Sequence, residues 1–502
     1  MPRKTESPES KLTPNVDTAS LTERRNHNKQ QSINNLPDEL LAKIFLVTTR
    51  LSIRPRGVYR FTLFPDVAIQ VCSQWLKVAL SNHALWTYIH IVEHFDDDDV
   101  ALWVSRAGPN ALFEIEIDIL EPYCGVAFFD ITDWAQQEFH IARIFKFFCS
   151  IKAGPQPWRS LSLSVLQPEP MYKFIQLLNK HTAPNLHYLY LCSEPDWNDD
   201  EFHEERCLTI AHYRKVYSLS EHAVPNLRHA EFTYVSWKYV FDRPKPLLSG
   251  LTILDLSAGS LIPPLVLPKI QNLLSANPNL KQLRIIAGSA SDYEFDRLQD
   301  EQRPNPARLS SLKILSLDGG DNSHSLLWDI LSIITAPSLE SLKLGNNGAS
   351  DGDEFTPKIF DYLTIGQLPK SENSPLTPTC KSPFPLLRKL DIVDMHVGDK
   401  MVTDLISSLP LVTHLLIDCY GAKPNLNKAP RVLPSLETLS LDCSGDHQHY
   451  QMVEDFLRQR VQNSIPIGIV EVPAKPQPEP HFKERFPGTV LRTGSCANIV
   501  VD

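Results

Sequence analysis

The densest group of side chains that could do chemistry is a run of four carboxylates, Asp96 to Asp99. Carboxylate oxygens are the ligands that hard cations prefer, so a clustered run is a candidate metal site. This run lacks the alternating spacing and the turn glycine of a calcium-binding loop. It also stands just before a helix predicted over 100–107, and acidic residues stabilise a helix N-terminus. We therefore predict that the run begins a helix and holds no metal.

Histidines are a weaker source of metal ligands in this chain. Most of the 17 histidines stand singly, and the close pair His447 and His449 falls in a predicted loop with no third ligand nearby in the sequence. No glycine-rich phosphate loop follows a predicted strand, and there is no Gly-x-Ser-x-Gly nucleophile motif. The sequence predicts no catalytic residue, no metal and no cofactor, so we do not expect an enzyme. A pocket assembled from distant segments stays open as an alternative.

Charge and composition limit the cellular compartments and the classes of partner that we expect for this chain. The 502 residues carry a net charge of -10, and the sequence shows no basic patch of the kind that nucleic-acid phosphates favour. No run approaches the roughly 18 apolar residues of a membrane-spanning helix. The nine cysteines lack paired short spacings, and the chain does not start with the layout of a secretory signal. We expect a cytoplasmic or nuclear protein that binds neither nucleic acid nor membrane.

Amphipathic segments near the start of the chain are the first elements that could position a binding surface. A helix is predicted from Pro37, with Asp38 and Glu39 in its first turn. Its apolar residues recur at three- and four-residue steps and are Leu36, Leu40, Leu41, Ile44 and Phe45. A second amphipathic segment is predicted over 67–80. These segments are either a docking surface or the core of a larger domain.

An ordered set of residues in these segments resembles an F-box of the divergent kind common in fungal proteins. The set is Leu36-Pro37-x-Glu39-Leu40 with Ile44, then Val71-Cys72-x-x-Trp75, then Leu85-Trp86. The resemblance implies helices that dock onto a Skp-type adaptor and, through it, onto a cullin-based ubiquitin ligase. It implies that the adaptor is contacted by Leu36, Pro37, Leu40, Ile44, Val71, Cys72 and Trp75.

Beyond this segment the chain alternates between predicted strands and helices, and a repeat becomes visible. Strands are predicted over 86–92 and 112–120 and helices over 100–107 and 136–151, the latter with Phe139 among its apolar residues. The repeat is an apolar residue, two variable residues, an apolar residue, one variable residue and an apolar residue. Its copies are Trp158-Leu161-Leu163, Leu186-Leu189-Leu191, Leu227-Ala230-Phe232, Leu251-Leu254-Leu256, Leu280-Leu283-Ile285, Leu312-Leu315-Leu317, Leu339-Leu342-Leu344, Leu387-Leu390-Ile392, Val412-Leu415-Ile417 and Leu436-Leu439-Leu441.

Prolines and predicted helices lie between the copies of this repeat. Seven copies have a proline two residues before the first apolar position, where it ends a helix and leads into a strand. Helices are predicted between strands over 265–274, 325–334, 355–363, 401–409 and 451–461. The pattern resembles the leucine-rich repeat, which implies an α/β solenoid with parallel strands on a concave face and helices outside.

The sequence therefore predicts a modular protein. Residues 1–32 form a disordered segment, 33–90 an F-box-like adaptor-binding domain, 91–471 an irregular leucine-rich-repeat-like solenoid and 472–502 a proline-rich tail. The resemblance implies the substrate receptor of a Skp-cullin-F-box ubiquitin ligase, with an unknown protein target. The residues expected to contact that target are Tyr188, Tyr190, Arg284, Lys313, Lys343 and Asp391. The alternative is a repeat scaffold unconnected to ubiquitin, whose first helices serve as a cap.

Overall fold

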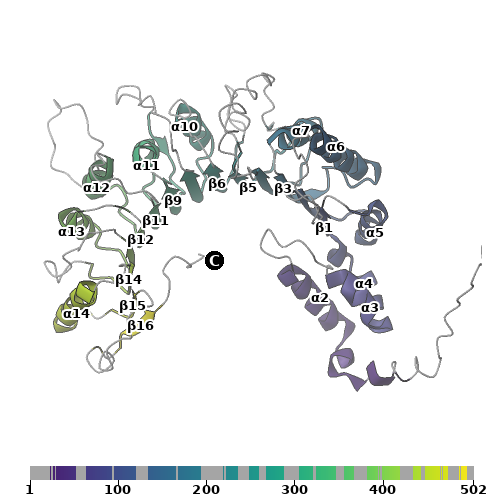
Figure 1. The fold of residues 1–502 in the computed structure, drawn as a ribbon, viewed down its shortest axis with the longest axis horizontal. Helices are drawn as coiled ribbons and strands as arrows, with labels where there is room; N and C mark the ends of the chain where they lie inside the picture. The colour runs from purple at the N-terminus through teal and green to yellow at the C-terminus, as the bar shows by residue number, and fades with distance from the viewer. Residues whose placement is uncertain are drawn as a thin grey trace, which may run out of the picture. The chain divides into compact units, whose positions relative to one another are not determined.

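A computed structural model of the chain shows two compact units (Figure 1). The structure describes residues 30–52, 64–92, 95–119, 134–165, 168–193, 222–235, 248–258, 267–287, 305–319, 324–345, 355–366, 382–393, 398–418, 433–442, 447–463, 467–472 and 488–493, with a few shorter pieces. Unit 1 comprises residues 1–90 and 95–114, and unit 2 comprises 91–94 and 115–502. The predicted disordered segment 1–32 lies almost wholly outside the described residues.

Unit 1 is a small helical assembly. Its elements are η1 (Ser32–Asn35), α2 (Asp38–Ser52), α3 (Phe64–Val71), α4 (Ser73–Ser81), η2 (His83–Trp86) and α5 (Asp97–Ala107), with the first residues of β1 (Tyr88–Val92) and β2 (Phe113–Ile119). The segment predicted as one amphipathic stretch over 67–80 is two helices, because Cys72 has extended backbone and is the N-cap of α4. Residues 95–114 cluster with this unit rather than with the repeats.

Aromatic side chains form the core of unit 1. Phe45 of α2 is fully buried, and its ring centroid lies 4.8 Å from that of Trp75 on α4. The Trp75 indole donates a 2.7 Å hydrogen bond to Oδ1 of Asn34, which ties η1 to α4. Trp86 is buried and donates to the carbonyl of Ala79 at 3.0 Å. The helices therefore pack as one body and do not depend on propensity alone.

Unit 2 is built on parallel strands. Among the described residues a fourteen-stranded sheet has an order that follows the chain, from β1 and β2 to β16. After β2 its strands are β3 (Trp158–Val165), β4 (Tyr188–Ser193), β5 (His229–Thr233), β6 (Ile253–Ala258), β7 (Gln282–Ala287), β9 (Ile314–Asp318), β11 (Ser341–Gly345), β12 (Lys389–Val393), β13 (His414–Asp418), β14 (Thr438–Asp442), β15 (Ile469–Val472) and β16 (Val490–Thr493). Neighbouring strands from β3 to β16 pair in parallel.

The apolar positions of the repeat stack strand upon strand. Leu189 of β4 pairs with Ala230 of β5, which pairs with Leu254 of β6, and all three are buried. The same register continues for the later copies, so each strand buries one face against the helices. The predicted strand-helix repeat is confirmed. The strand predicted over 112–120 is confirmed as well: the residues of β2 are buried and half-buried in turn.

A tight turn explains the prolines. In the seven copies preceded by proline, the N–H of the first apolar residue donates to the carbonyl three residues earlier, as from Leu186 to Ala183 and from Leu387 to Phe384. Proline then occupies the second position of a four-residue turn, where its fixed φ is favourable and its missing N–H costs nothing. The turn sets the start of each strand.

Helices cover one face of the sheet in unit 2 (Figure 1). They are α6 (Trp134–Ser150), α7 (Pro168–Leu178), α10 (Leu267–Ala276), α11 (His324–Ser332), α12 (Phe355–Ile365), α13 (Asp399–Ser408) and α14 (His447–Gln462). Each predicted helix is present, with ends that differ by a few residues. The apolar residues of α6 are not all buried: Phe139 is 74% exposed, whereas Ile141, Ile144 and Phe145 are buried. Phe139 lies outside the stripe because the buried residues fall three and four apart from Ile141 onward.

Three further features differ from the sequence predictions. His447 and His449 lie in the first turn of α14 and not in a loop. The segment 472–502 contains β16, which pairs with β15 although Thr493 replaces an apolar residue of the repeat. A separate two-stranded sheet, β8 (Ala307–Arg308) with β10 (Ile334–Thr335), was not predicted because its strands are only two residues long.

Candidate binding surfaces

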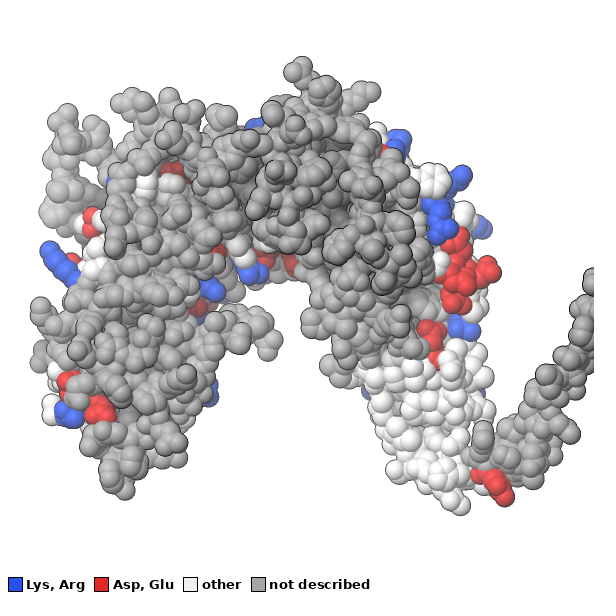
Figure 2. Space-filling model, in the orientation of Figure 1, with Lys and Arg blue, Asp and Glu red and all other residues white. Residues whose placement is uncertain are grey.

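Unit 1 exposes a set of large apolar side chains, here named the apolar surface. Leu40, Ile44 and Val47 follow one another at four- and three-residue steps along α2 and are 46%, 39% and 56% exposed. Four more exposed apolar residues come from α3 and α4, namely Val67, Val71, Leu76 and Leu80. Figure 2 shows a broad area without Lys, Arg, Asp or Glu where Figure 1 places the helices of this unit. Contiguous exposed apolar area marks interaction sites in soluble proteins.

Helix α2 has two apolar faces. Leu41 and Phe45 point into the core and are fully buried, while Leu40 and Ile44, one residue earlier in each case, lie outside. The outward stripe is therefore not needed to fold the unit. A helix that is apolar on both sides has one face for its own core and one face available for another molecule.

The predicted adaptor residues divide between surface and core. Pro37, Leu40, Ile44 and Val71 are exposed, and Leu36, Cys72 and Trp75 are half-buried. Three contacts hold the half-buried residues. Trp75 packs on Phe45 and donates to Asn34, Cys72 is the N-cap of α4, and Leu36 lies in the turn between η1 and α2. The sequence interpretation missed Val47, Val67, Leu76 and Leu80. Val47 lies three residues after Ile44 and Val67 four residues before Val71, and this helical spacing is the signal that would have found them.

Unit 2 carries a second candidate surface, here named the strand face, on the side of the sheet away from the buried repeat positions. Its side chains come from the variable positions of the repeat, so they form rows across the strands. In one row Tyr190, Glu231, Asp255 and Arg284 are successive partners in register. In parallel strands such neighbours lie roughly 4.8 Å apart. The row continues through Ser316, Lys343 and Asp391.

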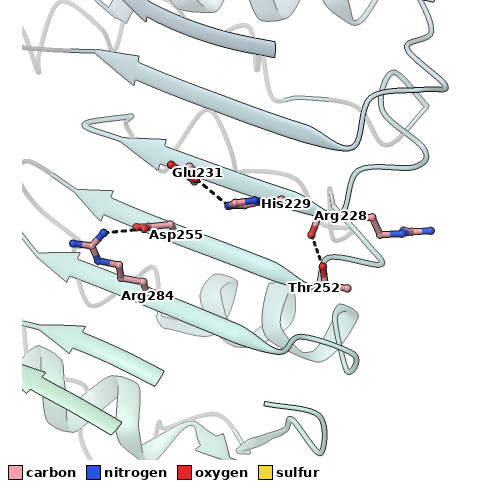
Figure 3. Close-up of polar contacts among 6 residues, drawn as sticks. All are labelled: Arg228, His229, Glu231, Thr252, Asp255 and Arg284. Atoms are coloured by element: carbon pink, nitrogen blue, oxygen red, sulfur yellow. Dashed lines mark hydrogen bonds and ion pairs between the residues drawn. The ribbon is translucent and has the colours of Figure 1, made fainter. Parts of the chain in front are cut away.

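Ion pairs organise the centre of the strand face (Figure 3). His229 and Glu231 are two residues apart on β5, and the Nε2 to Oε1 distance is 2.9 Å. Arg284 on β7 donates from one guanidinium nitrogen to Oδ2 of Asp255 on β6 at 3.2 Å. The ring of Tyr188 meets that of His229 edge-on, with centroids 4.8 Å apart. Two neighbouring carboxylates are thus flanked by an aromatic pair and by one cation.

Burial changes the acidity of two carboxylates on this face. Desolvation raises the pKa of Asp255, and the negative charge of Glu231 adds to the effect, while Arg284 lowers it. Desolvation also raises the pKa of Asp391, against the lowering effect of Lys389 at 3.3 Å. A carboxylate that is costly to keep ionised gains from a nearby cation, and Arg284 and Lys389 supply that cation to Asp255 and Asp391.

The residues predicted to bind a target also divide. Tyr188, Arg284 and Lys343 lie on the strand face with accessible side chains, whereas Tyr190 and Asp391 are 5% and 9% exposed. Lys313 is not on the strand face, because it precedes β9 and pairs with Glu340 at 2.9 Å. The prediction missed His229, Glu231 and Asp255. Their positions in the repeat are the same as those of Tyr188, Tyr190 and Arg284, and the repeat pattern would have found them.

The run of aspartates begins a helix in the structure. The Asp96 carboxylate caps α5 by accepting a 2.8 Å hydrogen bond from the N–H of Asp98, as the run of aspartates predicts. Within the described part of the chain no three His, Cys, Asp or Glu residues are grouped so as to hold a metal ion. No helix among the described residues is long and apolar enough to cross a bilayer.

Comparisons with known proteins give a distant structural likeness. No protein-family model matches the chain, and no curated protein matches it. Among solved structures the chain is similar to TLR13 in the crystal structure of a TLR13-ssRNA13 complex, with 14% identity and a TM-score of 0.28. The match covers 64% of this chain and 43% of the TLR13 chain, so it spans less than half of that protein.

The fold assignment therefore depends on the strand order of the chain itself. The molecule is a mixed α/β protein with a large parallel sheet. That architecture is consistent with a leucine-rich-repeat-like solenoid.

Proposed function

We propose that this chain is the substrate-receptor subunit of a Skp-cullin-F-box ubiquitin ligase. In this proposal the apolar surface of unit 1 binds a Skp-type adaptor, and the strand face of unit 2 binds a protein target. The chain then acts by proximity, because holding a target beside the transferring enzyme raises its effective concentration without catalysis by the receptor. No cofactor, nucleic acid or membrane takes part.

The observation that carries the proposal is the outward apolar stripe of α2. Leu40, Ile44 and Val47 expose between 39% and 56% of their area although the helix already has a complete inner face. The residues of the F-box-like set that lie outside, Pro37, Leu40, Ile44 and Val71, belong to this surface or border it. An amphipathic helix that presents such a stripe fits a hydrophobic groove on a partner.

The second candidate is a repeat scaffold whose first helices only cap the array. It is favoured by Leu85 and Trp86, which are buried immediately before β1 and so fasten the helices to the start of a strand. A terminal cap needs a polar outer face to remain soluble. The exposed stripe of α2 has the opposite character, and for that reason we prefer the adaptor-binding function.

A titration of the full chain with a purified Skp-type adaptor tests the proposal. The variant is Leu40→Asp combined with Val71→Asp, and the matched control is Leu102→Asp, because Leu102 on α5 belongs to the same unit and is 44% exposed, close to the 46% of Leu40. Burying the exposed half of a leucine is worth about 1 kcal/mol, and an unsatisfied carboxylate in the interface costs roughly 1–3 kcal/mol more.

We expect the double variant to weaken adaptor binding by about a hundredfold or more, and the control to bind within about threefold of the unaltered chain. Trp75→Asp is a poorer probe because Trp75 also packs in the core. The proposal fails if the unaltered chain does not bind the adaptor, or if variant and control bind equally well.

A further inference from the structure

A row of basic residues runs along the edge of the sheet where the strands begin, and it is here named the entry row. Each member directly follows the first apolar position of its repeat. The backbones form a ladder in which the N–H of each member donates to the carbonyl of the member before it. The N–H of His187 donates to the carbonyl of Arg159 at 2.9 Å, and the N–H of Arg388 donates to the carbonyl of Glu340 at 2.8 Å. The entry row comprises the first eight steps of this ladder, which are Arg159, His187, Arg228, Thr252, Lys281, Lys313, Glu340 and Arg388. Beyond Arg388 the ladder continues through Thr413 and Glu437 to Gly468.

The entry row is strongly positive on a chain of negative net charge. Its cations, Arg159, Arg228, Lys281, Lys313 and Arg388, are all exposed. Glu340 is the one acidic residue between Arg159 and Arg388, and a second, Glu437, follows two steps beyond Arg388. The chain as a whole has a net charge of -10. The row is invisible in the sequence because its members are separated by whole repeats, and only the parallel register of the strands brings them together.

The side chain of Arg228 shows how a member of the row is directed relative to the strand face. Figure 3 shows Arg228 extending beyond the start of β5, away from Glu231 and Asp255, which lie along the strands. One guanidinium nitrogen of Arg228 donates to the carbonyl of Gly250 at 3.1 Å. Gly250 has a φ of +79°, and a Cβ there would lie 2.7 Å from that nitrogen. The backbone thus leaves room for Arg228 to hold its position.

Glu340 does not cancel the row. Its carboxylate accepts a 2.9 Å hydrogen bond from Lys313, which together with the positive charges of Lys313 and Arg388 lowers its pKa. One carboxylate lies between two cations, and the three members keep a net positive charge. Arg228 and Lys281 have no acidic neighbour on either side of them within the row.

A cleft adds further positive charge beside the first strands. It has a volume of about 600 Å³, and it is lined in part by Lys152, Lys180, His181 and His222. Of the described residues that line it, none is acidic. Pro157 also lines the cleft and stands two residues before Arg159, so the cleft adjoins the entry row. Lys152 and Lys180 follow the C-terminal ends of α6 and α7, where the helix dipole stabilises cations. Because the dipole alone accounts for these two lysines, the entry row is stronger evidence for a binding site than the cleft.

We infer that the entry row binds an extended acidic peptide segment of the protein target. From Arg159 to Arg388 the row spans seven strand steps, or roughly 34 Å at about 4.8 Å per step. An extended segment of about ten residues has the same length. Glutamates and aspartates on such a segment meet a cation at most steps, and the complementary charges steer the encounter. A single-stranded nucleic acid is the poorer fit because its bases gain affinity by stacking on aromatic side chains, and no member of the entry row is Phe, Tyr or Trp.

This inference rests on the proposal that unit 2 binds a protein target, and it is independent of adaptor binding. The test uses the full chain and a fluorescein-labelled oligoglutamate peptide of about ten residues, with binding measured by fluorescence anisotropy. The variant is Lys281→Glu combined with Lys313→Glu. The control is Lys146→Glu combined with Lys400→Glu, which changes the net charge equally at exposed lysines on α6 and α13.

We expect the control to bind within about twofold of the unaltered chain and the variant to bind about tenfold more weakly, because two attractions are lost and two repulsions are introduced at exposed sites. Lys281→Gln combined with Lys313→Gln should have an intermediate effect, and circular dichroism checks that each variant is folded. Affinity should fall as salt is added.

The inference is overturned if the unaltered chain does not bind the peptide, if the control weakens binding as much as the variant, or if a single-stranded oligonucleotide binds and the peptide does not. None of these outcomes bears on the adaptor titration, so a failure here and a failure of the ligase proposal are distinguishable.

Discussion

Replacing Asn277 with alanine should strongly destabilise the middle of the repeat array. Asn277 is fully buried just after α10, and its amide nitrogen donates to the carbonyls of Leu248 and Leu273, both at 2.8 Å. Its side-chain oxygen accepts a 2.7 Å hydrogen bond from the N–H of Leu251. This one side chain therefore fastens a helix end to the entry of β6.

The magnitude follows from the groups left without partners. Asn277→Ala leaves the buried carbonyl of Leu248 and the N–H of Leu251 unsatisfied, at roughly 1–3 kcal/mol each, so we expect a loss of about 4 kcal/mol. The matched control is Asn226→Ala, which removes an exposed hydrogen bond of 2.7 Å to Pro184 and should cost about 1 kcal/mol or less.

Hydrogen exchange is the appropriate assay, because a long repeat array need not unfold in two states. Amides of residues 251–258 and 282–287 should exchange several hundredfold faster in Asn277→Ala, while those of β3 and β4 change little. Equal exchange in Asn277→Ala and Asn226→Ala would refute the role assigned to the buried amide.

Three further predictions concern single side chains. Burial raises the pKa of Tyr362 from 10.0 to about 12. The tyrosine of the unfolded state therefore loses its proton first, and the free energy of unfolding falls as the pH rises above 10. Tyr362→Phe should remove about 1 kcal/mol of that loss at pH 11, measured by urea unfolding of both proteins at pH 9 and pH 11. Gly250→Ala should lower the free energy of unfolding by about 1–2 kcal/mol in the same assay, because the φ of Gly250 is positive and the new Cβ would displace Arg228. It should also weaken oligoglutamate binding. Unchanged stability would contradict the close approach of Arg228 to Gly250. Trp75→Phe keeps an aromatic ring near Phe45 but loses the hydrogen bond to Asn34. Residues 32–36 should therefore exchange their amide protons about tenfold faster. Unchanged exchange would show that η1 is held by other contacts.

The strand-helix architecture could be predicted because the repeat encodes it locally. Leu189 and Leu191 alternate with Tyr188 in a period of two, and Pro184 marks the turn that starts the strand. These signals need no knowledge of distant residues, and the structure confirms them. The same local pattern fails at β16, where Thr493 takes the place of an apolar residue and the strand is recognised only by its pairing with β15.

The candidate surfaces were predicted less well because they depend on distance in space. Leu40 and Leu41 are adjacent and equally apolar, and only packing decides that one is exposed and the other buried. The entry row joins Arg228, Lys281 and Lys313 across separate repeats, so the sequence shows no basic cluster. Trp75 matches the F-box-like set in type, but its partners in the core could not be inferred from spacing.

Affinity capture of the full chain from cells, followed by mass spectrometry, tests the central claim that the two units bind different partners. Two variants are compared with the unaltered chain: Leu40→Asp combined with Val71→Asp in unit 1, and Glu231→Lys combined with Arg284→Glu on the strand face of unit 2. The account predicts that the first variant loses adaptor and cullin and keeps the target, and that the second loses the target and keeps adaptor and cullin. It is contradicted if adaptor and cullin are absent from the unaltered capture, or if both variants lose the same proteins while remaining folded.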